Sequence, residues 1–254
     1  GDRFGIGVTI DGNYAIVSTR NGEDTVSDSG SAYVFNRDET TGVWSEKQEI
    51  TASDAATGDN FGISVSLSGD YAIIGAHAKN SSRGAAYIFK RTGTTWTEQD
   101  TFTANDVAAS DGFGYSVGIS GDYAIIGARG NDGSGSAYIF KRDTNAETWT
   151  QHQKLKGNDT VSGDEFGNSV AIEGDYVIIG SHYYDHSGNT NPGAAYIFKR
   201  DGASDTWSED QKLTASDPAN YNGFGESVTL SGDYAIIGAT NGDTSTVTDS
   251  GAVY

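Results

Sequence analysis

The sequence predicts an all-β fold, a β-propeller of repeated four-stranded blades, and three observations carry the prediction. Nearly the same sixteen-residue stretch, FGISVSLSGDYAIIGA in its clearest copy, begins five times in the 254 residues, at Phe4, Phe61, Phe113, Phe166 and Phe224. Ten residues always separate this Phe from the Tyr of the following GDY or GNY turn. Alternating or continuous apolar runs fill each unit, and no stretch shows a sustained helical period.

Each unit predicts four short strands in chain order. In the second unit, residues 61–67 alternate, and the turn residues 68–70 and the apolar run 71–76 complete a hairpin. A loop ending in Gly84 leads to a third strand at 85–91, and a turn at 92–95 leads to a fourth strand beginning at Trp96. The second and third strands are near-continuous apolar runs, as expected of strands buried on both faces of small sheets stacked around an axis.

The lengths between repeated residues indicate which parts of each unit are rigid. Every Trp of the fourth strand lies seventeen residues before the next Phe, whereas the span from the GDY Tyr to the Tyr of the third strand varies from 15 to 20 residues. We expect one domain over 1–254, with units beginning near residues 1, 58, 110, 163 and 221.

The fifth unit stops within its third strand. Residues outside the chain could complete a five-bladed ring, or the units could belong to a longer array; we favour five blades.

Composition excludes several classes of partner. Lys and Arg number 16 against 35 Asp and Glu, a formal net charge of −19, and such a surface repels nucleic-acid phosphates and anionic lipid headgroups. No apolar run approaches the roughly 20 residues of a membrane helix. The absence of cysteine excludes disulfides and thiolate chemistry. We therefore expect no nucleic-acid partner and no membrane insertion.

The pairing of FG with GA about a dozen residues later, followed by a third strand such as GAAYIF, resembles the FG-GAP repeats of integrin-α-like β-propellers. The resemblance covers essentially the whole chain. It implies a propeller whose FG strand is innermost and whose Trp strand is outermost. It also implies adhesion or ligand binding, outside the cell or at its surface, on the face that carries the loops between second and third strands and between blades.

The family's calcium cage is reduced in this chain. Family repeats often carry D-x-D-x-D-G before the second strand, but here a single Asp stands in the turn, and one carboxylate cannot supply the six to eight oxygens that Ca²⁺ takes. We therefore predict no metal ligands at that position and no required cofactor.

A second set of carboxylates lies between the Trp and the next Phe. One interpretation is a repeated calcium site; the other, favoured by the constant loop length, is that Asp side chains hydrogen-bond nearby amides in a turn. The set comprises Asp54 and Asp59, Asp106 and Asp111, Asp159 and Asp164, and Asp217, whose partner position holds Asn222.

The aromatic residues also allow two interpretations. The four Trp could be sugar-stacking platforms, but their register with the repeat favours packing of outer strands across the blade edges. Tyr33 and Phe35, with their equivalents such as Tyr87 and Phe89, are predicted to form the core between blades. The Trp in question are Trp44, Trp96, Trp149 and Trp207.

A ligand touches particular blades, so residues that break the repeat are the informative ones. The longest irregular loops, 20–30, 182–193 and 240–251, all lie between second and third strands. The middle loop supplies the candidate ligand-binding residues, and a metal, a sugar or protein contact and a solvated loop all remain open interpretations. These residues are His182, Tyr183, Tyr184, Asp185 and His186.

Nothing in the sequence marks a catalytic centre. The chain has four His and no Cys, and it lacks G-x-S-x-G and H-E-x-x-H patterns. We predict a non-catalytic binding and adhesion module, extracellular or on the cell surface, that presents variable loops to a protein or carbohydrate ligand. The alternative is a structural subunit that self-assembles through propeller edges into a filament or surface layer, because an incomplete blade leaves an open edge.

Overall fold

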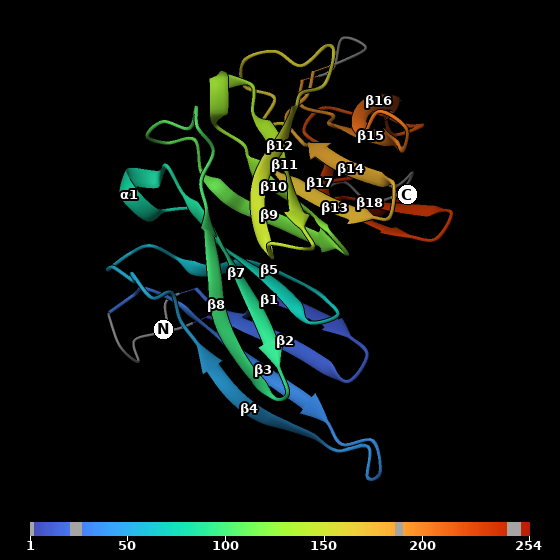
Figure 1. Ribbon diagram of the computed structural model, residues 1–254. Coiled ribbons are helices and arrows are strands. Elements are labelled where there is room, and N and C mark those ends of the chain that lie inside the picture. Colours follow the sequence, from blue (N-terminus) through green and yellow to red (C-terminus); the bar gives the residue numbers. More distant parts are fainter. Residues whose placement is uncertain (1–2, 21–26, 186–189, 243–249) are drawn as a thin grey trace.

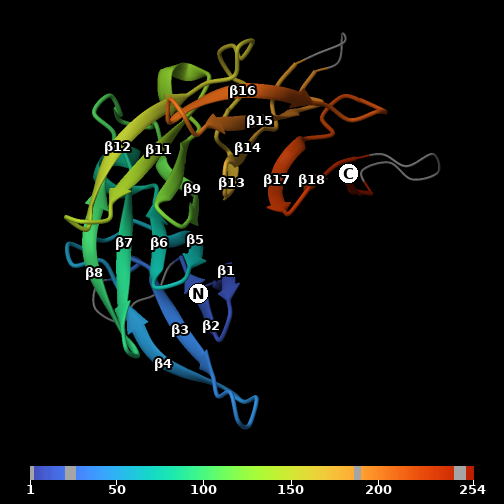
Figure 2. The same cartoon turned by 45° about the vertical axis from the view of Figure 1, so that its right-hand side comes forward.

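The computed structural model describes residues 3–20, 27–185, 190–242 and 250–254 as five separate antiparallel sheets (Figure 1). Four sheets have four strands and the fifth has three, and in every sheet neighbouring strands follow one another along the chain. The sheets stand as blades around a common axis, with the first strand of each blade innermost (Figure 2). The predicted all-β propeller of five units, the fifth without its outer strand, is confirmed.

The strands of each blade run from the inner edge to the outer edge. Blades 1 and 2 contain β1 (Phe4–Asp11), β2 (Tyr14–Thr19), β3 (Ser31–Arg37), β4 (Trp44–Ile50), β5 (Phe61–Ser68), β6 (Tyr71–Ala76), β7 (Ala85–Thr92) and β8 (Thr95–Phe102). Blades 3 and 4 contain β9 (Phe113–Ser120), β10 (Tyr123–Ala128), β11 (Ser136–Asp143), β12 (Thr148–Leu155), β13 (Ser169–Glu173), β14 (Tyr176–Ser181), β15 (Ala194–Asp201) and β16 (Thr206–Leu213). Blade 5 contains β17 (Phe224–Ser231), β18 (Tyr234–Ala239) and β19 (Ala252–Val253).

Helical structure is confined, in the described residues, to two turns in the loops between second and third strands. These are α1 (Lys79–Ser82) and the 3₁₀ turn at Asn131–Gly133, and both contain residues with positive φ, so neither is a regular helix. Within the described ranges, no helix has the length and apolar character needed to cross a membrane.

The second strands form the buried centre of blades 2 and 3, whereas β18 of blade 5 is largely exposed. All six residues of β6 and of β10 are buried, because each strand is bonded to a neighbour on both edges and packed by other blades on both faces. Continuous apolar runs are what such positions require. The prediction that these strands are buried on both faces is confirmed.

Adjacent blades meet through backbone atoms. In the contact between blades 2 and 3, the Phe113 N–H donates to the Arg83 carbonyl at 3.0 Å, and a Cβ on Gly84 would lie 1.9 Å from the Phe113 oxygen. Gly84 also has φ +85°, a conformation that side-chain-bearing residues avoid. The same contact recurs at the other three junctions, at Gly30 with Phe61, Gly135 with Phe166 and Gly193 with Phe224.

A second backbone contact explains why FG and GA stay in register. A Cβ on Gly127, the GA glycine of blade 3, would lie 2.0 Å from the carbonyl oxygen of Gly167, the FG glycine of blade 4. The Ser116 hydroxyl donates to the same oxygen at 2.8 Å. The junctions of blades 2 and 3 and of blades 4 and 5 repeat this arrangement, with Gly75, Ser64 and Gly114 and with Gly180, Ser169 and Gly225.

The outer strands are joined by aromatic packing. Trp149 is 6% exposed and lies edge-on to Tyr71 of the preceding blade, with ring centroids 5.9 Å apart. The Arg142 guanidinium lies 4.6 Å from the centre of the Tyr71 ring and bonds Asp122, the single Asp of the turn before β10. Trp96 and Trp207 are packed in the same way, so the packing interpretation is confirmed for these three tryptophans. It is wrong for Trp44 of blade 1, which is 38% exposed because no preceding blade in the described residues covers it. At Asp70, Asp122 and Asp175, the Asp at the position of the family's calcium cage holds an Arg against the neighbouring blade.

We expect Gly127→Ala to destabilise the fold and Gly238→Ala, at the equivalent position of blade 5, to be tolerated. The first places a methyl group against a neighbouring blade's carbonyl, whereas near Gly238 only the Ser227 side chain comes within 3 Å. Overpacking at Gly127 should lower the free energy of unfolding by about 1–3 kcal/mol or more, with a change of about 0.5 kcal/mol or less for Gly238. Urea unfolding of both variants measures this, and equal losses would contradict the proposed close approach.

Candidate functional site

The residue after each second strand differs chemically from blade to blade. These five equivalent residues are Arg20, His77, Arg129, His182 and Thr240. They occupy one end of the second strands, beside the inner strands, because every second strand runs in the same direction relative to the axis (Figure 2). The repeat thus places variable side chains together on a constant scaffold.

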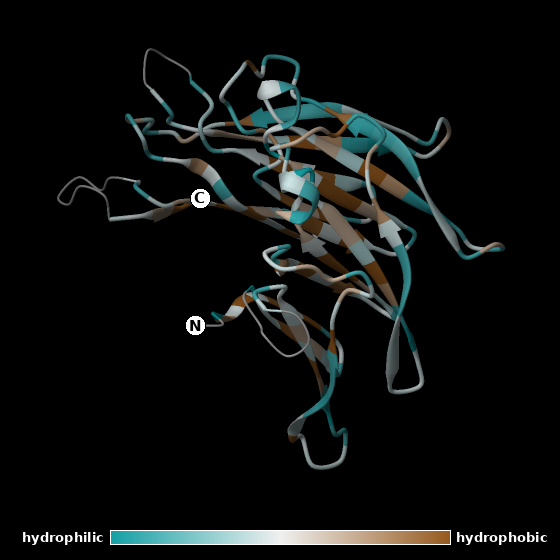
Figure 3. Ribbon diagram, turned by 90° about the vertical axis from the view of Figure 1, so that its left-hand side faces the viewer, coloured by the Kyte–Doolittle hydropathy of each residue, from teal (hydrophilic) through white to brown (hydrophobic). Residues whose placement is uncertain are grey.

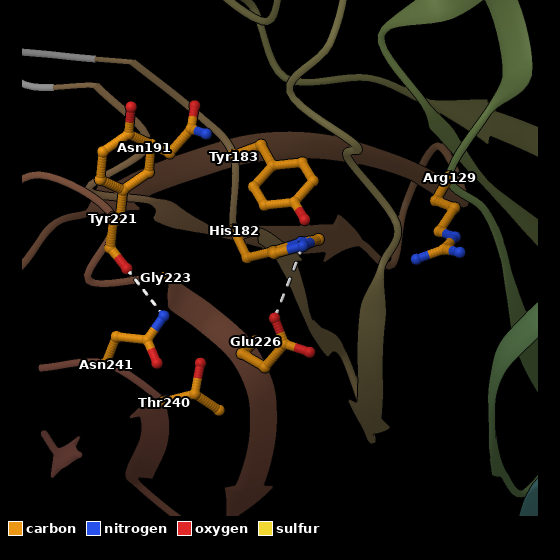
Figure 4. Close-up of a pocket in the computed structure, with 9 residues that line it drawn as sticks. All are labelled: Arg129, His182, Tyr183, Asn191, Tyr221, Gly223, Glu226, Thr240 and Asn241. Carbon is orange, nitrogen blue, oxygen red and sulfur yellow. Dashed lines mark hydrogen bonds and ion pairs between the residues drawn. The ribbon is translucent and has the colours of Figure 1, made fainter. Parts of the chain in front are cut away.

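A cavity of about 390 Å³ opens on this face between blades 3, 4 and 5 (Figure 4). Its walls come from the ends of second strands, the start of β17 and the loops that precede β15 and β17. The lining residues are Arg129, His182, Tyr183, Asn191, Tyr221, Gly223, Glu226, Thr240 and Asn241.

One imidazole nitrogen beside this cavity faces two carboxylates. His182 Nε2 lies 3.5 Å from a Glu226 oxygen and 3.9 Å from a Glu165 oxygen, and Arg129 bonds Glu165 at 3.2 Å. The His182 side chain is 7% exposed, and among the described residues its buried Nδ1 has no hydrogen-bond partner. Nδ1 is thus enclosed by protein atoms, whereas Nε2 faces the two carboxylates.

Burial sets the charge states in this cluster. Burial, with a smaller effect of the Arg129 charge, lowers the pKa of His182 to about 4, so the imidazole is neutral at pH 7. Burial also raises the pKa of Glu165 and of Glu226, and the Glu165 charge raises that of Glu226 further. The cluster combines one neutral ring, one guanidinium and two carboxyl groups whose ionised forms are disfavoured by burial.

Tyrosine and amide groups form the rim. Tyr221 is 61% exposed and Tyr183 is 44% exposed, so both present ring surface to solvent. The Tyr183 ring centroid lies 3.9 Å from that of His182. The Asn241 amide donates to the Tyr221 carbonyl at 3.2 Å, which joins the loop before β17 to the end of β18. Aromatic faces next to amides suit a ligand with both apolar and hydroxyl surfaces.

The structure separates the residues that the sequence grouped as one site. His182 and Tyr183 line the cavity. Tyr184 is 8% exposed, and its hydroxyl donates to Asp159 at 2.8 Å, so it packs within the blade. Asp185 accepts a hydrogen bond from the Asn191 backbone at 2.6 Å. His186 lies outside the described residues.

Several residues of the cluster were not predicted from the sequence. Arg129, Glu165 and Glu226 are distant from one another in the chain and lie directly beside the repeated FG and GA motifs, outside the long loops. A comparison of the residues directly flanking FG and following GA in each unit would have found them, because those positions differ from blade to blade.

The paired carboxylates between blades have structural partners. Asp106 accepts a hydrogen bond from the Tyr138 hydroxyl at 2.9 Å and forms an ion pair with Lys154 at 2.6 Å. Asp111 accepts the Ala108 backbone amide at 2.7 Å, as the turn interpretation predicts. Asp54, Asp159 and Asp217 likewise bind tyrosine hydroxyls, and Asp59 and Asp164 bind backbone amides.

We expect neither Ca²⁺ nor EDTA to change the melting temperature, because lysine, tyrosine and backbone donors already engage these carboxylates. Differential scanning calorimetry at a fixed protein concentration and ionic strength measures this, with Mg²⁺ as the control for a general effect of divalent charge. A rise in melting temperature with Ca²⁺ alone would instead support the repeated cation site, since a ligand that binds only the folded state stabilises it.

We expect the His182 ring to titrate near pH 4 in NMR spectra, and Arg129→Gln to raise its pKa by removing a nearby positive charge. The unfolded imidazole binds its proton near pH 6.5, so this histidine contributes a loss of folding stability as the pH falls from 6.5 to about 4. His182→Gln should remove that contribution, seen as a shallower fall in stability over this range. Titration of His182 near 6.5 would contradict its burial.

Comparison with known proteins agrees with this architecture. Five segments of the chain match the FG-GAP repeat family, at residues 1–35, 44–89, 96–140, 149–198 and 207–254. No curated protein matches. A crystal structure from Bacteroides fragilis, of a protein named for a proposed 6-phosphogluconolactonase activity, aligns with a TM-score of 0.55 and 17% identity over 84% of this chain. The chain spans 55% of that protein's length, and the likeness is one of fold. With family matches over most of its length, the chain belongs to the FG-GAP repeat family.

Proposed function

We propose that this chain is a non-catalytic binding and adhesion module, extracellular or on the cell surface, whose cavity between blades 3 and 5 holds part of a carbohydrate ligand. The observation that carries the proposal is the cluster of His182, Glu226 and Arg129, which has no equivalent in the other blades. A purely structural position would be expected to repeat from blade to blade, as the junction glycines do. Loops on a rigid scaffold are also where binding sites concentrate.

The chemistry of the cavity supports a carbohydrate. Its volume of about 390 Å³ lies in the range of small-ligand pockets, about 300–1,000 Å³. The neutral His182 ring, the Glu226 carboxyl and the Asn241 amide offer donors and acceptors suited to adjacent hydroxyl groups. The exposed faces of Tyr183 and Tyr221 can cover the apolar face of a sugar ring.

Binding accounts for the site better than catalysis does. Glu165 is held by Arg129 at 3.2 Å, and His182 faces two carboxyl oxygens at 3.5 Å and 3.9 Å, so no nucleophile and base are closely paired in this cluster. The lactonase-named structure shares the fold at 17% identity, which supports no transfer of activity. The resemblance to adhesion propellers supports the extracellular or surface location.

We expect the purified chain to bind glycans on an array, and Tyr221→Ala and His182→Gln each to weaken the strongest interaction by about tenfold or more. The loss follows from removing a stacking surface in one variant and a buried hydrogen-bonding ring in the other. Isothermal titration calorimetry measures the dissociation constants. His77→Gln is the matched control, because His77 holds the equivalent place in blade 2 but lies outside the cavity. Burial lowers the pKa of His77 as it does that of His182.

Equal binding by all three variants would remove this cavity from the binding surface. An array without bound glycans would overturn the carbohydrate proposal. A protein ligand whose affinity falls with Tyr221→Ala would keep the cavity as the site but change the ligand class.

A further inference from the structure

Among the residues that the structure describes, one carboxylate of the cavity lacks a cationic partner. Glu226 and Arg129 are the charged residues of the lining. The Arg129 guanidinium bonds Glu165 at 3.2 Å and stands apart from Glu226 in Figure 4. Glu226 instead faces His182 Nε2 at 3.5 Å, and that imidazole is neutral at pH 7 because burial lowers its pKa to about 4. The negative charge of Glu226 is therefore left without an ion pair.

The surroundings of Glu226 make this charge costly. The inner parts of the blades are largely hydrophobic, whereas many connecting loops are hydrophilic (Figure 3). Glu226 directly follows the Phe-Gly pair that begins β17, and its side chain is 37% exposed. Burial raises its pKa, the Glu165 charge raises it further, and the Arg129 charge opposes them only in part. A positive group beside this carboxylate would stabilise its ionised form.

Elsewhere in the chain, a carboxylate beside a tyrosine ring is completed by a lysine or an arginine. Lys212 Nζ lies 2.5 Å from an Asp159 oxygen and 4.6 Å from the centre of the Tyr184 ring. The ammonium group thus meets a negative charge and the negative face of an aromatic ring together. The same grouping recurs at Lys154 with Asp106 and Tyr138, and at Arg142 with Asp122 and Tyr71.

The cavity contains the carboxylate and the tyrosines of this grouping without the cation. Tyr183 and Tyr221 line the cavity together with Glu226, and their rings are 44% and 61% exposed. In Figure 4, His182 lies between Tyr183 and Glu226. The two tyrosine rings therefore remain open to a group that enters from solvent, and a positive group suits both the rings and the carboxylate.

We propose that the carbohydrate held by this cavity is an amino sugar, whose protonated amine pairs with Glu226 while its ring lies against Tyr221. This inference rests on the proposed function and narrows its ligand class. An amino sugar has hydroxyl groups and an ammonium group on one ring, so a single residue can use the carboxylate, the tyrosine face and the amide of Asn241 at once. The net charge of −19 favours the approach of such a cationic ligand.

The test compares three oligosaccharides of the same length and linkage, built from glucosamine, glucose or N-acetylglucosamine. They differ in one substituent, which is an amine, a hydroxyl or an acetamide. Isothermal titration calorimetry at a mildly acidic pH, where the sugar amine is protonated, measures the dissociation constants. We expect the glucosamine oligosaccharide to bind at least about tenfold more tightly than the other two.

Glu226→Gln removes the charge while keeping the size of the side chain. We expect it to bring the affinities for the glucosamine and glucose oligosaccharides to within about twofold of each other. Glu226→Asp retains the charge and should retain the preference for the amine. Asp233→Asn is the matched control, because it changes the net charge equally at an exposed turn between β17 and β18, outside the cavity. This control should leave the preference unchanged.

Equal binding of the glucosamine and glucose oligosaccharides by the unaltered chain would overturn the inference and leave the carbohydrate proposal standing. Equal loss of preference in Glu226→Gln and Asp233→Asn would also overturn it, because the attraction would then come from the acidic surface as a whole. A chain that binds none of the three would contradict the proposed function instead. A short peptide with one Lys, compared with its norleucine analogue, then tests the cation site alone. Binding of the Lys peptide that Glu226→Gln abolishes would support that site, and absence of binding would overturn it.

Discussion

The close approach of glycine backbone to a neighbouring blade's carbonyl group is the constraint on which this propeller depends. At Gly127 a single methyl group would have to occupy space 2.0 Å from the Gly167 oxygen, and no rotamer change can relieve a clash with backbone. Blade 1 shows that the contact recurs even where the residue types differ. There Ser18 replaces the GA glycine and Gly7 replaces the inner-strand serine, and the Ser18 hydroxyl still donates to Gly62 at 2.5 Å. The hydroxyl has changed strands while its acceptor has stayed in place.

Part of the chain's large negative charge is used in contacts at the blade junctions. Many carboxylates are tied into the junctions: Asp122 holds Arg142 over Tyr71, and Asp106 joins Lys154 to the Tyr138 hydroxyl. These pairs are partly exposed, so each contributes modest stability, and their regular recurrence matters more for keeping blades in register. The same positions that resemble cation sites by composition therefore act as internal connections between blades.

The sequence predicted the scaffold well because its determinants are local and repeated. Apolar runs, turn residues and constant spacing located the strands, and the register of the tryptophans indicated their packing. The candidate site was harder, because adjacent residues of one loop have different surroundings: Tyr183 is 44% exposed at the cavity while Tyr184 is 8% exposed and bonded to Asp159. Arg129 and Glu226 come from different blades, and only their positions relative to the axis bring them to His182. Neither the direction of a loop side chain nor contacts between distant units can be obtained from periodicity.

The position of the cavity follows from the junctions themselves. Glu226 directly follows the Phe-Gly pair of blade 5, and His182 directly follows the second strand of blade 4, so both backbones are held by the contacts that join these blades. A side chain next to such a contact is placed precisely enough for recognition, yet it is free to vary because the contact uses only backbone and glycine.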